Sequence, residues 1–304
     1  MPISQDNFEG SEQKPLLEIS SNPISDLENG TAASSSAEDA LSTDSIISRD
    51  QDQVDRAFAR FQVWAMTVAQ VFAAISVLLV LYWAHLMGGL SWETPKEAFN
   101  WHPVMMVLCF AIMTISMVSF RLKCMPSRSW AKRVHYMGWL VAALCAAVAL
   151  VAVFYSRNFS ETGFGANMYS LHSWMGALVI LLYLGQLVVG AMTFLGYSPA
   201  WWTRIIRGAH TSTILSIHYL VGPVIYYGTM ATILLGFQEK GKSMECSYSE
   251  ILDKPDYLPF LHFFDIPWVC RLSHLLCLVI FLMSVFVTIG LHDFQRVSHS
   301  SDRR

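Results

Sequence analysis

The chain has few charged residues: Asp, Glu, Lys and Arg make up 14% of its 304 residues, whereas 54% are hydrophobic. The mean hydropathy is correspondingly high, at +0.40. An ordinary soluble domain has about a quarter of its residues charged, so this composition excludes that class for most of the chain. The extreme N-terminus also lacks a basic stretch followed by an apolar core, so we expect no signal peptide there.

The charges that are present are unevenly spread. Residues 1–60 hold many Ser, Asp and Glu residues without apolar periodicity, including the run NGTAASSSAEDALSTDS. Such a composition is typical of disordered chains. We therefore predict a disordered tail over residues 1–60 and a second, short tail over residues 293–304.

Six apolar segments lie between the tails, each of about 20 residues or more, enough to cross a hydrocarbon core of about 30 Å as a helix. Their ranges are Phe61–Met87, His102–Phe120, Val134–Tyr155, Leu171–Leu195, Thr211–Phe237 and Trp268–Leu291. Only helices and closed barrels satisfy the backbone in lipid, and continuous apolar runs favour helices. The predicted fold class is all-α, a six-span transmembrane helix bundle over residues 61–292.

Lys and Arg in the short loops predict how the bundle is oriented, because these residues accumulate on the cytosolic side. The loops after the second and fourth segments are basic, with Arg121, Lys123, Arg128, Lys132, Arg133, Arg204 and Arg207. In the loops after the first and third segments, Lys96 and Arg157 lie near acidic residues. We therefore expect the second and fourth loops, and both chain termini, in the cytosol.

Four of the segments carry a histidine near one end, and an ionisable group within a span marks a functional site by default. With the predicted orientation, His102 and His172 lie on the non-cytosolic side, and His135 and His218 on the cytosolic side. Two imidazoles at one depth on facing helices suit a six-coordinate haem iron, and bundle cores commonly hold such sites. The residues alone leave open a histidine-lined metal or proton transporter without haem. The chain has no C-x-x-C-H motif for covalent haem attachment.

Four stretches resemble the cytochrome b561 family: HLMGGLSW (His85–Trp92), FNWHPVMMV (Phe99–Val107), NMYSLHSWMG (Asn167–Gly176) and GFQEK (Gly236–Lys240). The resemblance implies a six-span membrane protein with two haem b groups, surrounded by membrane lipid and forming a homodimer. It also implies electron transfer from cytosolic ascorbate to monodehydroascorbate or a ferric chelate on the other side. No nucleic-acid partner is expected.

The resemblance also implies the axial ligands of the two haem irons. Depth already pairs His102 with His172 and His135 with His218, because the second span can face the fourth and the third can face the fifth, and the same four histidines match the axial ligands of the family. His210 is the alternative ligand for the fifth segment, because the linker after the fourth segment is longer here than is usual in the family.

On the cytosolic side the resemblance places ascorbate, an anion, at Lys132 and Arg128, three and seven residues before His135. It places Arg121 at a haem propionate. The family has a lysine where this chain has Arg128, which keeps the charge but not the ammonium. The positive-inside rule alone also predicts basic residues in this loop.

On the other side the resemblance places His85 and Arg157 in the pocket for the electron acceptor. Many family members have His-Asn where this chain has Arg157 and Asn158, and an arginine still attracts an anionic chelate or radical. The residues implied around the outer haem are Asn167, Tyr169, Ser170 and Glu239.

Three further patterns concern processing and location. Cys246 and Cys270 flank the last non-cytosolic loop, where disulfides persist, and we predict that they are bonded, the alternative being two free thiols. Asn158 begins a glycosylation sequon, Asn-Phe-Ser. The tail sequence EQKPLLEIS resembles an acidic dileucine signal, with Glu12 four residues before Leu16. It predicts an endosomal, lysosomal or vacuolar membrane.

Overall fold

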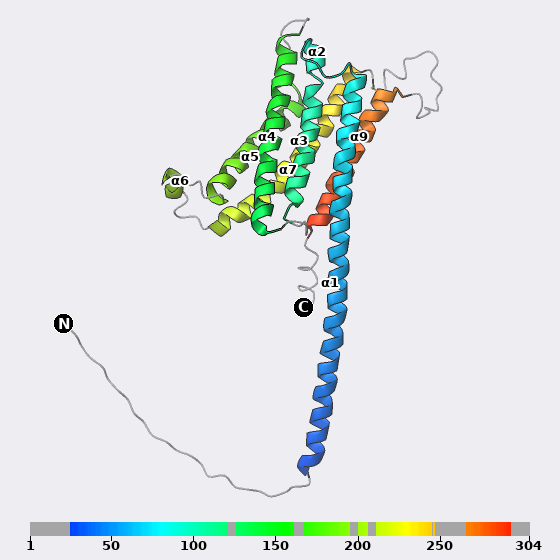
Figure 1. Ribbon diagram of the computed structural model, residues 1–304, viewed down its shortest axis with the longest axis vertical. Coiled ribbons are helices and arrows are strands. Elements are labelled where there is room, and N and C mark those ends of the chain that lie inside the picture. The colour runs from blue at the N-terminus through cyan, green and yellow to red at the C-terminus, as the bar shows by residue number, and fades with distance from the viewer. Residues whose placement is uncertain are drawn as a thin grey trace, which may run out of the picture. The chain divides into compact units, whose positions relative to one another are not determined.

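The computed structural model describes residues 25–120, 126–160, 167–194, 200–205, 211–244, 246 and 266–292. Within these ranges every regular element is a helix. The helices are α1 (Ser25–Leu86), α2 (Pro95–Ala98), α3 (Trp101–Val118), α4 (Arg128–Asn158), α5 (Leu171–Phe194), α6 (Ala200–Ile205), α7 (Thr211–Ser243) and α9 (Trp268–Leu291) (Figure 1).

Six of these helices are long and apolar enough to cross a membrane. Their candidate spans are Ser48–Leu86, Pro95–Val118, Arg128–Asn158, Leu171–Phe194, Thr213–Lys242 and Trp268–Leu291. The predicted all-α, six-span fold class is therefore confirmed.

The chain divides into two units, Met1–Ala57 and Phe58–Arg304. In the first unit, however, α1 begins at Ser25, so residues 25–57 are helical where the composition predicts disorder. This stretch contains no proline and several alanines, so its backbone can adopt a helix.

The second unit is a bundle in which the ends of successive helices alternate between two ends (Figure 1). Near α2 lie the end of α1 and the starts of α3 and α5; we call this the α2 end. At the opposite end, the α6 end, α4 and α7 begin and α9 finishes. Gln62 Nε2 donates a hydrogen bond to the His292 carbonyl, which holds the first span beside the last one at the α6 end.

A turn of two glycines sets the start of α3. Gly88 and Gly89 follow α1 with φ of +105° and +87°, and residues that have a Cβ atom rarely adopt these backbone angles. The buried Asn100 side chain donates to the carbonyls of Met87 (3.2 Å) and Gly89 (2.8 Å). The amide thus ties the turn to the N-cap residue of α3, two residues before His102.

Small residues allow α3 and α4 to pack closely. The buried residues of α4 are all alanines: Ala131, Ala142, Ala146, Ala149 and Ala152. Without longer side chains between them, the backbones of two membrane helices can approach. The close approach brings each helix within reach of polar side chains from the other.

Aromatic residues fill the core where α3, α7 and α1 meet. The rings of Phe110 and Tyr226 stack with centres 4.7 Å apart, and the Tyr226 hydroxyl lies 2.9 Å from Thr114 Oγ1. On α1, the buried Trp83 indole donates to Ser273 Oγ of α9 at 2.9 Å. These buried polar contacts fix the rotation of each helix about its axis.

A disulfide closes the α2 end. Cys246, just after α7, is bonded to Cys270 in the first turn of α9, with their Cα atoms 5.8 Å apart. The predicted bond is therefore confirmed. It holds the end of α7 against the start of α9.

Candidate functional site

The structure brings the four histidines together in two pairs, one at each end of the bundle. His102 of α3 faces His172 of α5 with ring centres 6.0 Å apart. His135 of α4 faces His218 of α7 with ring centres 6.2 Å apart. We call them the α3–α5 pair and the α4–α7 pair. They are the pairs expected from depth alone; His210, the alternative, lies outside the described residues.

Each imidazole is oriented by an oxygen on a neighbouring helix. In the α3–α5 pair, His102 Nδ1 lies 3.0 Å from the Ala149 carbonyl and His172 Nδ1 lies 2.8 Å from the Thr232 carbonyl. Because a carbonyl oxygen only accepts, each Nδ1 must carry the proton and donate it. Nε2 is then unprotonated, with its lone pair available to a metal.

The α4–α7 pair is oriented in the same way. His135 Nδ1 donates to the Ser116 carbonyl at 3.0 Å. His218 Nδ1 lies 3.2 Å from Oε1 of Gln186, a side-chain oxygen. In both pairs, therefore, the nitrogen that remains free is Nε2.

These bonds are reciprocal between helices. His102 on α3 bonds to the backbone of α4, and His135 on α4 bonds to the backbone of α3. His172 on α5 bonds to α7, and His218 on α7 bonds to α5. Each histidine pair therefore has one ring from the helix pair α3 and α4 and one ring from the helix pair α5 and α7.

The pairs fit the axial positions of a haem iron. A metal about 2 Å from one nitrogen of each ring, the usual length of a metal–imidazole bond, needs ring centres about 6 Å apart. The observed separations are 6.0 and 6.2 Å. In the part of the chain that the structure describes, no three His, Cys, Asp or Glu side chains gather as a metal site. Two nitrogens alone suit a group such as haem that brings its other donors with it.

Gly236 of α7 makes room for the α3–α5 pair. A Cβ atom at this position would lie 3.0 Å from Nδ1 of His172 and only 2.8 Å from Cε1, and the second distance is shorter than real Cβ contacts. Only glycine lets the helix pass the ring without displacing it. The GFQEK motif therefore contains a packing requirement for the histidine.

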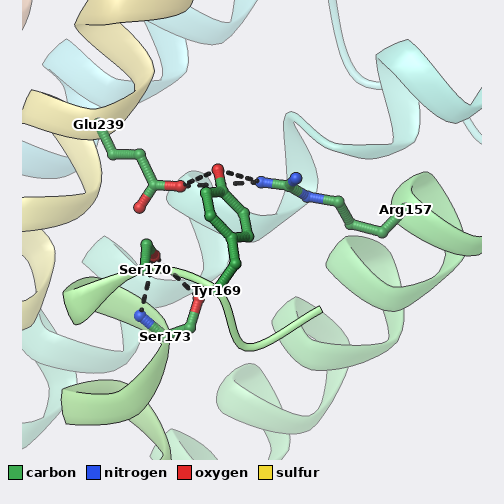
Figure 2. A network of polar contacts seen from close by, with 5 residues as sticks. All are labelled: Arg157, Tyr169, Ser170, Ser173 and Glu239. Atoms are coloured by element: carbon green, nitrogen blue, oxygen red, sulfur yellow. Dashed lines mark hydrogen bonds and ion pairs between the residues drawn. The ribbon is translucent and has the colours of Figure 1, made fainter. Parts of the chain in front are cut away.

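A polar cluster lies at the α2 end (Figure 2), and its Tyr169 is three residues before His172 in the sequence. Arg157 Nη2 donates to the Tyr169 hydroxyl at 3.2 Å, and that hydroxyl donates to Glu239 Oε1. Arg157 and Glu239 also form an ion pair of 3.8 Å. We call these three residues the Tyr169 cluster, which joins the end of α4, the segment just before α5 and the end of α7.

The segment before α5 is shaped for this cluster. Met168 has a φ of +55°, an uncommon value for a residue other than glycine. Such conformations persist only where the surroundings enforce them, often at functional sites. Next to it, Asn167 Nδ2 donates to Asn158 Oδ1 at 2.9 Å, and Ser170 Oγ accepts from the Ser173 amide at 3.3 Å. These bonds fix Tyr169 between its two partners.

The cluster leaves one acceptor unused and a second cation nearby. Among the described residues, Glu239 Oε2 is buried without a hydrogen-bond partner. The Lys240 ammonium lies 4.5 Å from the centre of the Phe99 ring. Lys240 was not singled out from the sequence, although it belongs to the GFQEK motif. His85 is exposed in the last turn of α1, and in the described part of the chain no hydrogen bond or ring contact joins it to the cluster.

At the α6 end, Arg128 and Lys132 begin α4, four residues apart and hence on one helix face. Both are exposed, and neither forms an ion pair with another described residue. Their neighbour Arg133 instead lies over the Trp130 ring at 4.3 Å. Arg121, expected at a propionate, lies outside the described residues.

Apolar side chains separate the two histidine pairs. A cavity there is lined by Met106, Cys109 and Met113 of α3 and by Tyr183 of α5, among others. The Tyr183 hydroxyl donates to the Trp139 carbonyl. The interior between the pairs thus has few polar groups that could bind water or ions.

Comparison with known proteins agrees with this geometry. The family model of eukaryotic cytochrome b561 matches residues 101–243, which include all four histidines. The chain is also 32% identical over 183 residues to ascorbate-specific transmembrane electron transporter 2 of Zea mays, a match covering 59% of this chain and 73% of that one. The chain belongs to the cytochrome b561 family. The family membership that the motifs predicted is therefore confirmed.

Animal members of the cytochrome b561 family match as well. Plasma membrane ascorbate-dependent reductase CYBRD1 of Rattus norvegicus is 37% identical over 172 residues, 55% of this chain and 56% of that one. Lysosomal membrane ascorbate-dependent ferrireductase CYB561A3 of Homo sapiens is 32% identical over 174 residues, 55% of this chain and 66% of that one. The chain thus spans a little over half the length of the rat reductase.

Proposed function

We propose that this protein carries electrons across a membrane from ascorbate to an acceptor on the opposite side. The observation that carries the proposal is the presence of two imidazole pairs, one near each end of a six-span bundle, each spaced for a metal and oriented through Nδ1. The names of the rat, human and maize relatives, an ascorbate-dependent reductase, a ferrireductase and an electron transporter, support it.

The cofactors we propose are two haem b groups. The α3–α5 pair would hold one and the α4–α7 pair the other, through the four Nε2 atoms. When bound, each haem would supply a one-electron couple. The protein holds the ligands, keeps water from the interior and sets the environment of each iron. Asn167, Tyr169, Ser170 and Glu239 would border the haem at the α2 end.

The donor site we propose lies at the α6 end, which would face the cytosol. Ascorbate is an anion, and Arg128 and Lys132 lie on the helix that carries His135, seven and three residues before it, with no ion pair to another described residue. Arg121 would bind a propionate of the nearby haem. In this orientation both chain termini, including the tail over residues 1–60, are cytosolic.

The acceptor site we propose is the Tyr169 cluster. Arg157, with Lys240 nearby, would attract an anionic ferric chelate or monodehydroascorbate. Glu239 Oε2, which is buried and unpaired among the described residues, can accept a hydrogen bond or a proton from a bound molecule. His85 would contribute from the end of α1. We further propose that two copies form a homodimer, as the family resemblance implies.

The membrane we propose is endosomal, lysosomal or vacuolar. Support comes from the pattern Glu12, Leu16 and Leu17 in the tail and from the human relative, which is named a lysosomal membrane protein. A cytosolic tail can offer such a segment to sorting proteins, ordering on contact. The acceptor side would then face the lumen.

A reduced-minus-oxidised absorption spectrum of the purified protein tests the central claim. We expect two b-type haems per chain, reduced on addition of ascorbate. A protein that purifies without haem would refute the proposal and favour the alternative of a histidine-lined metal or proton transporter.

A further inference from the structure

One of the four histidines is held differently from the rest. His102, His135 and His172 donate from Nδ1 to backbone carbonyls, of Ala149, Ser116 and Thr232. His218 alone donates to a side chain, the amide of Gln186 on α5. A backbone carbonyl is present whatever residue occupies the position, whereas the acceptor for His218 depends on the identity of residue 186.

Two hydrogen bonds fix the Gln186 amide and remove any ambiguity in its orientation. Gln186 Nε2 lies 3.0 Å from the His218 carbonyl, which can only accept, so this atom must be the NH₂ group. The other amide atom, 3.2 Å from His218 Nδ1, is therefore the oxygen. The ring nitrogen facing it must carry the proton, which leaves Nε2 of His218 free. One amide thus sets both the orientation and the tautomer of the ring.

The position of Gln186 makes this arrangement informative. The residue lies in the apolar span Leu171–Phe194, where an amide without partners is costly. Both of its observed bonds go to His218. Sequence reasoning passed over Gln186, although a polar amide inside a membrane span is the signal that could have found it.

We propose that Gln186 is the positioning residue of the α4–α7 site and that its amide oxygen sets the reduction potential of the haem held there. This inference rests on the proposed function, because it takes His218 as an axial ligand. An acceptor at Nδ1–H makes the imidazole a stronger donor to a metal. A stronger donor stabilises the ferric state, so removing the acceptor raises the potential of this haem and leaves the other haem unchanged.

Three substitutions in the full-length, haem-loaded protein test the proposal. Gln186→Leu removes both hydrogen bonds. Gln186→Glu keeps an acceptor oxygen at the same reach, and an ionised carboxylate would be a stronger acceptor than the amide. Gln70→Leu is the matched control, because Gln70 is a half-buried glutamine of α1 whose Nε2 has no partner among the described residues.

The readouts are haem per chain, the two midpoint potentials from a redox titration, and the low-spin ferric electron paramagnetic resonance signals. In Gln186→Leu we expect the midpoint potential of one haem to rise by at least about 59 mV, which is a tenfold change in its oxidised-to-reduced ratio. The paramagnetic resonance signal of the same haem should also change. Gln186→Glu should return that potential to the wild-type value or below it. Gln70→Leu should leave both potentials unchanged. Loss of one haem in Gln186→Leu, with retention in the other two variants, also supports the proposal.

Three results overturn the inference. The first is that Gln186→Leu leaves the potentials and signals unchanged, and the second is that Gln186→Leu and Gln70→Leu shift the potentials of both haems by the same amount. The third is that Gln186→Glu loses the haem as Gln186→Leu does. Its failure is distinguishable from failure of the proposed function. A wild-type protein without haem, or a His218→Ala variant that retains both haems, would refute the ligand assignment itself. Two haems with unshifted potentials would refute only the role of Gln186.

Discussion

Replacing Gly236 by Ala adds one methyl group at the point where α7 passes the His172 ring. The new Cβ would lie 2.8 Å from Cε1 of the ring, so the ring must move by roughly 0.6 Å to reach the ordinary contact distance of 3.4 Å. A binding site tolerates displacements of about 0.5 Å. The movement would also strain the 2.8 Å bond from His172 to the Thr232 carbonyl.

We expect Gly236→Ala to weaken haem binding at the α3–α5 pair by about 10-fold to 100-fold, the usual cost of disturbing the partners of a metal ligand. The haem at the α4–α7 pair should be unaffected. Haem content per chain and the reduced-minus-oxidised spectrum measure both quantities in the purified protein. The stability of the helix itself should not fall, because Ala stabilises a helix interior by about 0.5–1 kcal/mol relative to Gly.

Gly241→Ala is the matched control on the same helix. A Cβ at Gly241 would meet Cys246 Cβ at 3.7 Å, an ordinary contact distance, so this variant should keep both haems. The reasoning is refuted if Gly236→Ala retains two haems with wild-type spectra, or if Gly241→Ala loses as much haem as Gly236→Ala.

The other predictions concern the ligands, the donor site, the disulfide and the tail. Ala in place of either histidine of the α3–α5 pair should remove mainly one haem, and Ala in either histidine of the α4–α7 pair mainly the other; retention of both in His218→Ala with loss of one in His210→Ala would transfer the fifth-span role to His210. Arg128→Ala combined with Lys132→Ala should slow reduction by ascorbate at constant haem content, whereas Arg133→Ala, whose side chain lies over Trp130, should not; normal ascorbate kinetics in the double variant would leave the two residues as a topology signal alone. Cys246→Ser should lower stability by about 3 kcal/mol, because the bond closes a loop between residues 24 apart, and an unchanged melting temperature would contradict this. Ala at Leu16 and Leu17 should move the protein to the plasma membrane in cell imaging, and an unchanged distribution would exclude the dileucine signal.

Hydropathy predicts the spans well because a lipid core demands long apolar helices, but it predicts their ends poorly. The third span begins at Arg128 in the structure rather than at Val134, and the fifth continues to Ser243 rather than ending at Phe237. Polar residues extend both helices beyond the apolar core. A Ser127 side-chain cap, which accepts from the Trp130 amide at 3.3 Å, marks the true start of α4.

The depth of each histidine is predictable from its place along a span, and depth was enough to pair the rings. The partners of those rings are not predictable in this way. Whether His172 meets the Thr232 carbonyl, or His218 meets Gln186, depends on the rotation of each helix about its axis. Rotation is set by cross-helix packing, such as the alanine face of α4, rather than by hydropathy.

The reciprocal bonds of the histidines also bear on how the protein is assembled. The α3–α4 hairpin and the α5–α7 hairpin are each fastened internally by two imidazoles, before any cofactor arrives. Each haem would take one ligand from each hairpin, so its binding would add to the contacts that already join them, such as the hydrogen bond from Tyr183 to the Trp139 carbonyl, and would stabilise the joined state by mass action. We expect a cell that is short of haem to make a less stable protein that quality control removes, so that the abundance of the protein follows the haem supply.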